Sequence, residues 1–378
     1  HAAIANTARP TRPAAMRLGA SARLSDGETV MVIPSTLPGR PAPCMVRSYP
    51  RGPFAATARG RGMSGSETVP VLDWRDFAGG TNTEGFVASL SRACRQTGFF
   101  LLRHHGIDHR LIDDVFAHAD AMFALPEPEK AALSIATNPH NRGWAAMGSE
   151  RLDETSGQVD RKEAFNIGFD LSPDDPRARA GAPFRGVNLW PPVPGFRDVM
   201  LRYFASVQNL GVALHRALAR DLGLADDFFD DKFTEPMATL RLLHYPPASG
   251  AAGEIGAGAH TDYGSITLLL TDGEPGLQVR PRSGDWIDVP HQPDAFVVNI
   301  GDCLMRWSNE TYVSTPHRVL PPNRVRRSVA FFLDPNPDAE IAALPGTGTP
   351  KYPPVTGAAY LRSRLDATYG TGPQEEIP

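Results

Sequence analysis

The stretch that decides the fold is GAHTDYGSITLLL, residues 258–270. Apolar and β-branched residues follow its His-x-Asp triplet at strand-like positions, and turn residues such as Gly264 interrupt the pattern. Because side chains two positions apart on a strand share a face, His260 and Asp262 can project into one cavity. The stretch therefore predicts a strand that presents two potential metal ligands.

A second His-x-Asp triplet shows how little the pattern means alone. His118 and Asp120 lie in LIDDVFAHADAMFALP, where apolar residues recur at helical spacing. Side chains two apart on a helix point in different directions, so these two cannot easily chelate one ion. By itself, His260 can also be interpreted as a hydrogen-bonded structural histidine. The metal-ligand interpretation of His260 therefore depends on its partners.

The third potential ligand is His317, which lies downstream in STPHRV. Two imidazoles and one carboxylate can hold one face of an octahedral iron(II) and leave the opposite face open for a cosubstrate and oxygen. His260, Asp262 and His317 are therefore the predicted metal ligands, and together they favour a non-heme iron oxygenase.

A candidate anion site follows the second histidine, in NRVRRSVAFFLDP. On a strand, Arg326 and Ser328 share one face and Arg327 takes the other. A guanidinium fork beside a hydroxyl suits a distal carboxylate, which arginine can grip with two charge-assisted hydrogen bonds. Arg-x-Ser also occurs at Arg23 and Arg306, but only the copy at Arg326 follows the second histidine closely and leads into an apolar run. Arg326 is therefore the predicted carboxylate anchor.

Together these residues resemble the isopenicillin N synthase-like branch of the iron(II)/2-oxoglutarate-dependent dioxygenases, over roughly residues 68–370. That family places a distal histidine about 55 residues after His-x-Asp, followed by Arg-x-Ser, as this chain does. The resemblance extends to VPVLDWRDF, ACRQTGFFLLRHHGI, LPEPEK, RLLHYPP and VVNIGDCLMRWSN. It implies an enzyme that uses Fe(II), O2 and 2-oxoglutarate as cosubstrate. Such an enzyme hydroxylates, desaturates or cyclises a small-molecule substrate and releases succinate and CO2.

The resemblance also implies which residues bind the cosubstrate. Arg326 and Ser328 would hold its far carboxylate, and the hydroxyl of Tyr245 would help to hold it. Many relatives read Asn-x-Tyr before Pro-Pro, whereas this chain keeps Tyr245 but has Leu243 where asparagine is common.

Other members and other classes stay open at this point. Related iron oxidases that do not use 2-oxoglutarate, of the isopenicillin N synthase-like or ethylene-forming type, share much of this framework. Relatives that break 2-oxoglutarate down to ethylene cannot be separated by these motifs either. A non-catalytic jelly-roll binding module is a further alternative, but it predicts a degraded set of ligands.

The expected fold is α+β. Helical spacing predicts helices over residues 84–96, 109–124, 195–222 and 357–369, and short strands are expected over 69–72, 99–103 and 163–169. Beyond residue 230, turn residues separate short strands over 238–244, 265–270, 277–280, 285–289, 296–300 and 325–333. Many short strands predict a sandwich or barrel. The resemblance implies a double-stranded β-helix, or jelly roll, as the core behind a helix-rich N-terminal region.

Four regions are expected along the chain. Residues 1–67 form an extension, of which the first 62 contain nine Arg and only two acids and are predicted to be disordered. This extension also fits a transit peptide, but a non-native extension before a start at Met63 is preferred. The helix-rich dioxygenase region is expected over 68–230, the jelly-roll oxygenase core over 231–345, and a helix with a tail over 346–378.

Composition limits the possible partners. The formal net charge of −4 and the pI near 6.3 predict no attraction to nucleic acid or to an anionic membrane. The three cysteines, Cys44, Cys94 and Cys303, are widely spaced, which favours reduced thiols and a cytoplasmic location. A monomer is expected.

No sequence motif identifies the substrate, because the residues that select it lie on variable loops. The candidates come from segments expected to face the mouth of the barrel: Arg142, Trp144, Phe165, Asn166 and Phe332. Each of them can also be explained as a packing residue or a solvated loop charge.

Overall fold

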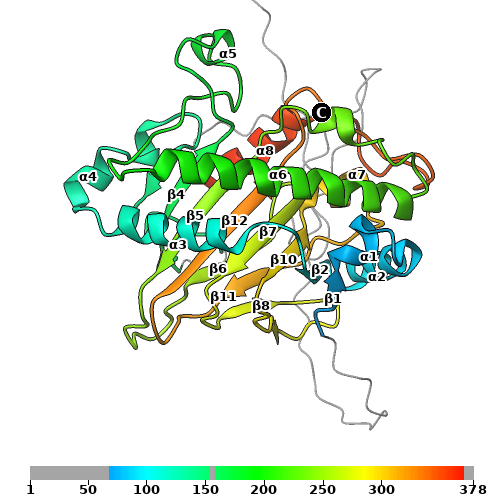
Figure 1. Cartoon of the computed structure of the whole chain (residues 1–378), viewed down its shortest axis with the longest axis horizontal. Helices are drawn as coiled ribbons and strands as arrows, with labels where there is room; N and C mark the ends of the chain where they lie inside the picture. Colours follow the sequence, from blue (N-terminus) through cyan, green and yellow to red (C-terminus); the bar gives the residue numbers. More distant parts are fainter. Residues whose placement is uncertain (1–67, 154–157, 370–378) are drawn as a thin grey trace, which may run out of the picture. The chain divides into compact units, whose positions relative to one another are not determined.

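One large antiparallel sheet contains strands from both the first and the last parts of the chain (Figure 1). The computed structural model describes residues 68–153 and 158–369. Among the strands of this sheet that the structure describes, only β1 and β2 pair in parallel. The strands across the sheet are, in order, β1 (Val71–Asp73), β2 (Phe99–Arg103), β10 (Ala295–Ile300), β7 (Ile266–Thr271), β12 (Arg326–Leu333), β5 (Thr239–Tyr245), β4 (Glu163–Gly168) and β3 (Gly143–Ala145).

A smaller sheet lies against the inner face of the large one. Its strands are, in order, β6 (Ala257–His260), β11 (His317–Val319), β8 (Leu277–Val279) and β9 (Ile287–Asp288). A separate short pair joins β13 (Glu340–Ile341) to β14 (Val355–Thr356). Two packed sheets of mainly antiparallel strands, together with the helices, confirm the predicted α+β class and the jelly-roll core.

Three long helices cover the outer face of the large sheet: α6 (Phe196–Asp221), α2 (Thr83–Gln96) and α3 (His109–Phe123) (Figure 1). The apolar residues of α6 recur every three or four positions, so that Val199, Tyr203 and Val207 share one buried stripe. This stripe packs against the outward side chains of the sheet, such as Leu240 and Phe331. The main core therefore lies between the helices and the large sheet.

The remaining helices are short, apart from the last. They are α1 (Trp74–Ala78), α4 (Glu127–Ala131), α5 (Pro176–Arg179), α7 (Asp302–Trp307) and α8 (Gly357–Tyr369), with 3-10 turns at Ile135–Thr137 and Asp230–Lys232. No helix in the described part of the chain is long and apolar enough to cross a membrane.

A second, smaller cluster of apolar side chains lies between the two sheets. It joins Phe99 and Leu243 of the large sheet to Ala257, Val279 and Val319 of the small one. Strand alternation explains this division, because neighbouring residues of each large-sheet strand face either the helices or the small sheet. The inner face of the large sheet is therefore available for a cavity.

The predicted elements agree with the structure to within about two residues, with one correction. Asp262 does not share a strand with His260: β6 ends at His260, and Asp262 lies in the turn that leads to β7. At this turn the chain leaves the small sheet and enters the large one. The Asp262 carbonyl accepts a hydrogen bond from the Asp302 N–H (2.7 Å), and this bond ties the turn to the start of α7.

The described residues of the regions expected along the chain belong to one compact unit. Strands β2 and β4, from residues 68–230, pair with β10 and β5, from residues 231–345, in the same sheet. We therefore propose that the described residues of 68–230, 231–345 and 346–378 are regions of one fold. The expectations for residues 1–67 and for the tail beyond residue 369 lie outside the described residues.

Candidate active site

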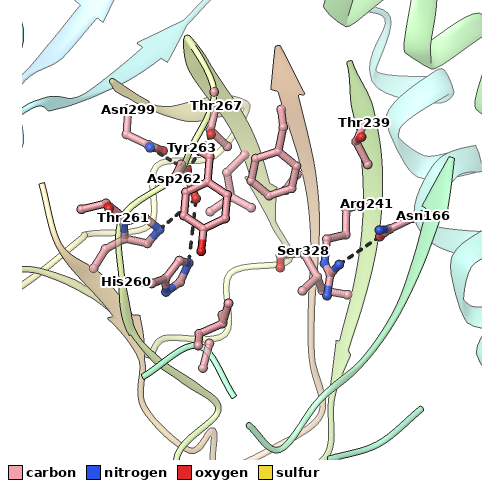
Figure 2. A pocket seen from close by; sticks show the side chains of 18 of the residues that line it. Asn166, Thr239, Arg241, His260, Thr261, Asp262, Tyr263, Thr267, Asn299 and Ser328 are labelled. Carbon is pink, nitrogen blue, oxygen red and sulfur yellow. Dashed lines mark hydrogen bonds and ion pairs between the residues drawn. The ribbon is translucent and has the colours of Figure 1, made fainter. Parts of the chain in front are cut away.

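A cavity of about 190 Å³ opens between the two sheets. Figure 2 shows His260 and Asp262 on one side of it and Asn166, Thr239 and Arg241 on the other. Its walls come from the inner faces of β4, β5, β7, β10 and β12 and from the small sheet, with Leu361 and Leu365 of α8 also lining it. Polar and apolar side chains therefore meet in one cavity, as in many ligand sites.

The three predicted metal ligands converge in this cavity. His260, Asp262 and His317 place their ligand atoms within 4.8 Å of one another. The two histidines are cross-strand partners in β6 and β11, which brings their rings to a centroid distance of 4.3 Å. Asp262 Oδ1 lies 3.8 Å from His260 Nε2 and 3.6 Å from His317 Nε2. Two nitrogens and one oxygen thus point at one position.

Backbone carbonyls orient both imidazoles. The Nδ1–H of His260 donates to the Gly258 carbonyl (2.8 Å), and that of His317 donates to the Thr315 carbonyl (3.2 Å). Since Nδ1 carries the proton in this arrangement, each Nε2 keeps its lone pair for a metal. The geometry fits the tautomer that a divalent metal needs.

The carboxylate of Asp262 is held on one side only. Asn299 Nδ2 and the Thr267 hydroxyl both donate to Oδ2, at 2.7 and 2.6 Å. Oδ1 remains directed at the two imidazoles. Sequence reasoning missed Thr267 and Asn299. The one available signal was a polar residue inside an otherwise apolar strand, and both strands have buried residues at these positions.

The charges of the three residues suit a cation. Burial lowers the pKa of His260 to about 3, so this imidazole is neutral at physiological pH. Burial opposes ionisation of Asp262, but the nearby His317 and His260 imidazoles hold its pKa below the usual range. Burial likewise opposes a charge on His317, but the Asp262 carboxylate raises the pKa of that imidazole. A buried carboxylate that attracts positive charge, flanked by two imidazole donors, fits a divalent transition metal.

Arg326 is the residue predicted to bind the carboxylate of a cosubstrate. Its side chain is only 1% exposed and lines the same cavity. Nη1 lies 3.4 Å from the Ser328 hydroxyl, and Nε has no hydrogen-bond partner. Within residues 68–153 and 158–369, no carboxylate forms an ion pair with Arg326. A buried guanidinium without an acid fits a site for a ligand carboxylate.

Tyr245 and Leu243 are the cross-strand neighbours of this pair. Arg326 faces Tyr245 across β12 and β5, with its guanidinium carbon 5.0 Å from the centre of the phenol ring. Ser328 faces Leu243 in the same register, and both residues line the cavity. The leucine that replaces the family's common asparagine therefore offers no hydrogen bond beside Ser328.

The five predicted substrate residues divide between the two faces of the sheet. Arg142, Asn166 and Phe332 line the cavity. Trp144 and Phe165 do not, which corrects the prediction for these two: they belong to the core between sheet and helices. Their strands pair Trp144 with Phe165 and Gly143 with Asn166, so alternation sends the two aromatic rings outward.

A polar network that the sequence did not predict forms part of the cavity wall. Arg241 binds Glu150 (2.5 Å) and donates to the Asn166 side chain (3.1 Å). Lys162 forms ion pairs with Asp160 (2.5 Å) and Glu150 (3.3 Å). Burial opposes ionisation of Glu150, but Arg241 and Lys162 lower its pKa to about 2. Both cations are therefore neutralised within the protein.

Two family models match the chain. The model of the 2OG-Fe(II) oxygenase superfamily matches residues 236–335, and the model of the N-terminal region of non-haem dioxygenases in morphine synthesis matches residues 69–193. A 2-oxoglutarate-dependent dioxygenase of Didymella fabae is 36% identical over 317 residues, which cover 80% of this chain and 96% of that protein. The 2-oxoglutarate-Fe(II) type oxidoreductase hxnY of Emericella nidulans is 37% identical, with coverage of 80% and 90%.

The chain is also similar to solved structures. Full-length T7H of Neurospora crassa, in complex with alpha-KG and thymine, superposes with a TM-score of 0.72 at 33% identity and covers 80% of this chain and 97% of T7H. JOX2 in complex with 2OG, Fe and JA has a TM-score of 0.65 at 30% identity, with coverage of 79% and 84%.

Proposed function

Because the chain belongs to the 2OG-Fe(II) oxygenase superfamily, we propose that His260, Asp262 and His317 hold its iron(II) and that Arg326 anchors its 2-oxoglutarate. The chain is a 2-oxoglutarate-dependent oxidoreductase that acts on small molecules. The observation that carries the assignment is the unpaired, buried guanidinium of Arg326, which lines the same cavity as the three ligands.

Each residue of the site has a defined task in this proposal. The two Nε2 atoms and Asp262 Oδ1 bind the metal, while Asn299 and Thr267 keep the other carboxylate oxygen occupied. When bound, iron(II) supplies the oxygen activation that couples decarboxylation of 2-oxoglutarate to oxidation of the substrate.

Arg326 and Ser328 bind the far carboxylate of 2-oxoglutarate. The guanidinium offers the unpaired Nε–H and its Nη groups, and Ser328 adds a hydroxyl. Tyr245 lies against the guanidinium and limits where the cosubstrate can lie. Since the guanidinium is already buried, it is unfavourable without a counter-ion, and the carboxylate of 2-oxoglutarate would remove that penalty.

Replacing Arg326 by alanine tests the assignment. Removing one partner of a buried ion pair costs about 3–5 kcal/mol, which corresponds to a loss of 2-oxoglutarate affinity of about a hundredfold or more. Succinate formation measured against 2-oxoglutarate concentration should show this loss, and Arg326→Lys should recover only part of it. Iron binding should stay nearly unchanged, whereas Asp262→Ala should lose iron.

The neighbouring arginine provides a matched control. Arg327 points to the other face, where it pairs with Asp272 (3.1 Å) and Asp120 (2.5 Å). Arg327→Ala should therefore leave the 2-oxoglutarate requirement close to that of the wild type. An unchanged requirement in Arg326→Ala would show that the cosubstrate is anchored elsewhere.

We also propose the finer features of the function. Relatives differ in what they bind, as the complexes of T7H with thymine and of JOX2 with JA illustrate. Hydroxylation, desaturation and cyclisation are all compatible with the site, and Arg142, Asn166 and Phe332 lie where a substrate would contact them. We propose a monomer that acts in the cytoplasm without a nucleic-acid or membrane partner. The net charge of −4 and the free, buried Cys94 and Cys303 support this setting.

A further inference from the structure

Arg142 is a second buried guanidinium in the cavity, and it also lacks an acidic partner. Its side chain is 2% exposed. Nη1 donates to the carbonyls of His140 (3.0 Å) and Asn141 (3.4 Å), Nη2 donates to the carbonyl of Phe184 (3.4 Å), and Nε has no hydrogen-bond partner. No carboxylate in the described part of the chain pairs with it, and the charged group that acts on it is another cation, Arg185.

The position of this guanidinium is built into the fold. It lies directly over Gly168, where an added Cβ would come within 1.8 Å of its Cζ atom. Only glycine leaves room there, and the three carbonyls fix the direction of the fork. Nη2 makes only one long hydrogen bond and Nε makes none, so the edge formed by Nε and Nη2 can still donate hydrogen bonds to a ligand. An edge of this kind can take the two oxygens of one carboxylate.

The wall around Arg142 faces the metal ligands, which is where a substrate must lie to be oxidised. Asn166 and Thr239, which line this wall with Arg142, lie across the cavity from His260 and Asp262 in Figure 2. A molecule bound between the two walls would therefore reach from Arg142 toward the metal position.

The charges in the cavity leave Arg142 unmatched. Lys162 and Arg241 are neutralised by Asp160 and Glu150. Arg326 is assigned to 2-oxoglutarate. Burial and the nearby Arg185 lower the pKa of Arg142 to about 10, so it still carries its charge at neutral pH. A buried charge without a counter-ion is unfavourable, and a bound anion would remove that penalty.

We propose that Arg142 binds a carboxylate of the substrate, so that the enzyme oxidises small organic acids. The inference rests on the proposed function, because the acid would share the cavity with 2-oxoglutarate. It adds a substrate class and a residue that selects it. The two carboxylate sites differ in position: Arg326 lies on β12, and Arg142 immediately precedes β3.

The test compares acids with their neutral amides. Calorimetry would measure binding of benzoate against benzamide, and of phenylacetate against phenylacetamide, to anaerobic enzyme loaded with iron(II) and saturated with 2-oxoglutarate. For the wild type, the acid of at least one pair should bind at least tenfold more tightly than its amide. Arg142→Gln should abolish this preference, and Arg142→Lys should keep part of it because the charge remains.

Arg185→Gln is the matched control. Arg185 is also a buried guanidinium that donates to backbone carbonyls, those of Pro236 and Glu235, but it does not line the cavity. Its loss should lower the thermal midpoint and leave the preference for acids intact. Gly168→Ala is a second route if Arg142→Gln folds poorly, because the new methyl group must displace the guanidinium and should reduce the preference.

Two results would overturn the inference. One is a wild type without preference for either acid, including one that binds none of the four probes. The other is a preference that survives in Arg142→Gln. The affinity for 2-oxoglutarate, measured in the same variants, separates this inference from the proposed function. It should fall in Arg326→Ala and not in Arg142→Gln; the reverse pattern would make Arg142 the cosubstrate anchor and reject both assignments.

Discussion

At the scale of single residues, Asp262 shows how one carboxylate can be both held and available. Oδ2 accepts hydrogen bonds from Asn299 and Thr267, and Oδ1 points at the two imidazoles. Asn299 and Thr267 are themselves cross-strand partners in β10 and β7, so the sheet register sets the position of both donors. The orientation of the anionic ligand is therefore a property of the sheet.

Removing Asn299 should weaken the metal site. Loss of a hydrogen bond to a ligating carboxylate typically lowers metal affinity about 10–100-fold, and we expect this range for iron(II) in Asn299→Ala. Anaerobic titration of each variant with iron(II), monitored by calorimetry, measures the affinity. Thr267→Ser keeps the hydroxyl and should bind iron nearly as well as the wild type. Equal iron affinity in Asn299→Ala and the wild type would mean that Asp262 does not need this support.

A second residue, His215, links stability to pH. It is fully buried in α6, where Nδ1–H donates to the Gly211 carbonyl and Nε2 accepts from the Ser265 hydroxyl, both at 2.8 Å. Burial lowers its pKa from 6.5 to about 4. Between these values the unfolded chain takes up a proton that the folded protein does not, so stability is lost as the pH falls from 6.5 to 4.

We expect this loss to approach about 3 kcal/mol near pH 4. Denaturant unfolding at several pH values between 7 and 4 measures it. His215→Gln should keep the hydrogen-bonding capacity and show a shallower pH dependence, whereas His291→Gln, at an exposed position, should behave as the wild type does. Parallel curves for wild type and His215→Gln would exclude a role for this imidazole.

At this scale, the sequence selected residues that the structure brings together in one cavity, but it did not select the side chains that hold them in place. Spacing and residue type were enough to select His260, Asp262, His317, Arg326 and Ser328. Asn299 and Thr267 could not be assigned a role, because they lie more than thirty positions apart and meet only through the register of β10 and β7. A hydrogen-bond partner across a sheet has no local signature.

At the scale of elements, the two faces of β4 explain which substrate predictions were wrong. Phe165 and Asn166 are neighbours on one strand, so only one of them can face the cavity. Alternation alone does not say which face receives the helices. The structure shows that the ring of Phe165 packs edge-on against Phe196 of α6, at a centroid distance of 5.7 Å. Asn166 therefore faces the cavity.

The two phenylalanines predicted as substrate residues should respond differently to truncation. Phe165 is completely buried in the main core, and Phe165→Ala should lower the free energy of unfolding by about 3–5 kcal/mol. Phe332 lines the cavity and is only partly buried, so Phe332→Ala should cost clearly less stability and alter binding in the cavity. Denaturant unfolding of both variants provides the comparison. A larger stability loss for Phe332→Ala would reverse the assignment of faces.

At the scale of the whole molecule, the two faces of the large sheet have different roles. Its outer face packs on α2, α3 and α6 and contains most of the apolar core. Its inner face, together with the small sheet, forms the cavity. The strand order could not be predicted from periodicity, because β2 pairs with β10 across nearly two hundred residues. Only the family resemblance implied this topology.

The last prediction concerns residues 1–62, which lie outside the described residues. Their composition, nine Arg with only Asp26 and Glu28 as acids, offers no periodic apolar face to bury. The family match begins at residue 69, and 80% of this chain corresponds to 96% of the Didymella fabae relative. A fold and site of this family therefore do not require such a segment.

Deleting residues 1–62 should leave both stability and catalysis unchanged. The thermal midpoint should stay within about 2 °C of the full chain, since such a shift corresponds to only about 1 kcal/mol for a domain of this size. Iron affinity and 2-oxoglutarate-dependent succinate formation should also match. Asn299→Ala in both backgrounds serves as a control, because its loss of iron affinity should be the same with and without the segment. A lower midpoint or a lower rate after deletion would show that residues 1–62 pack on the oxygenase and complete it.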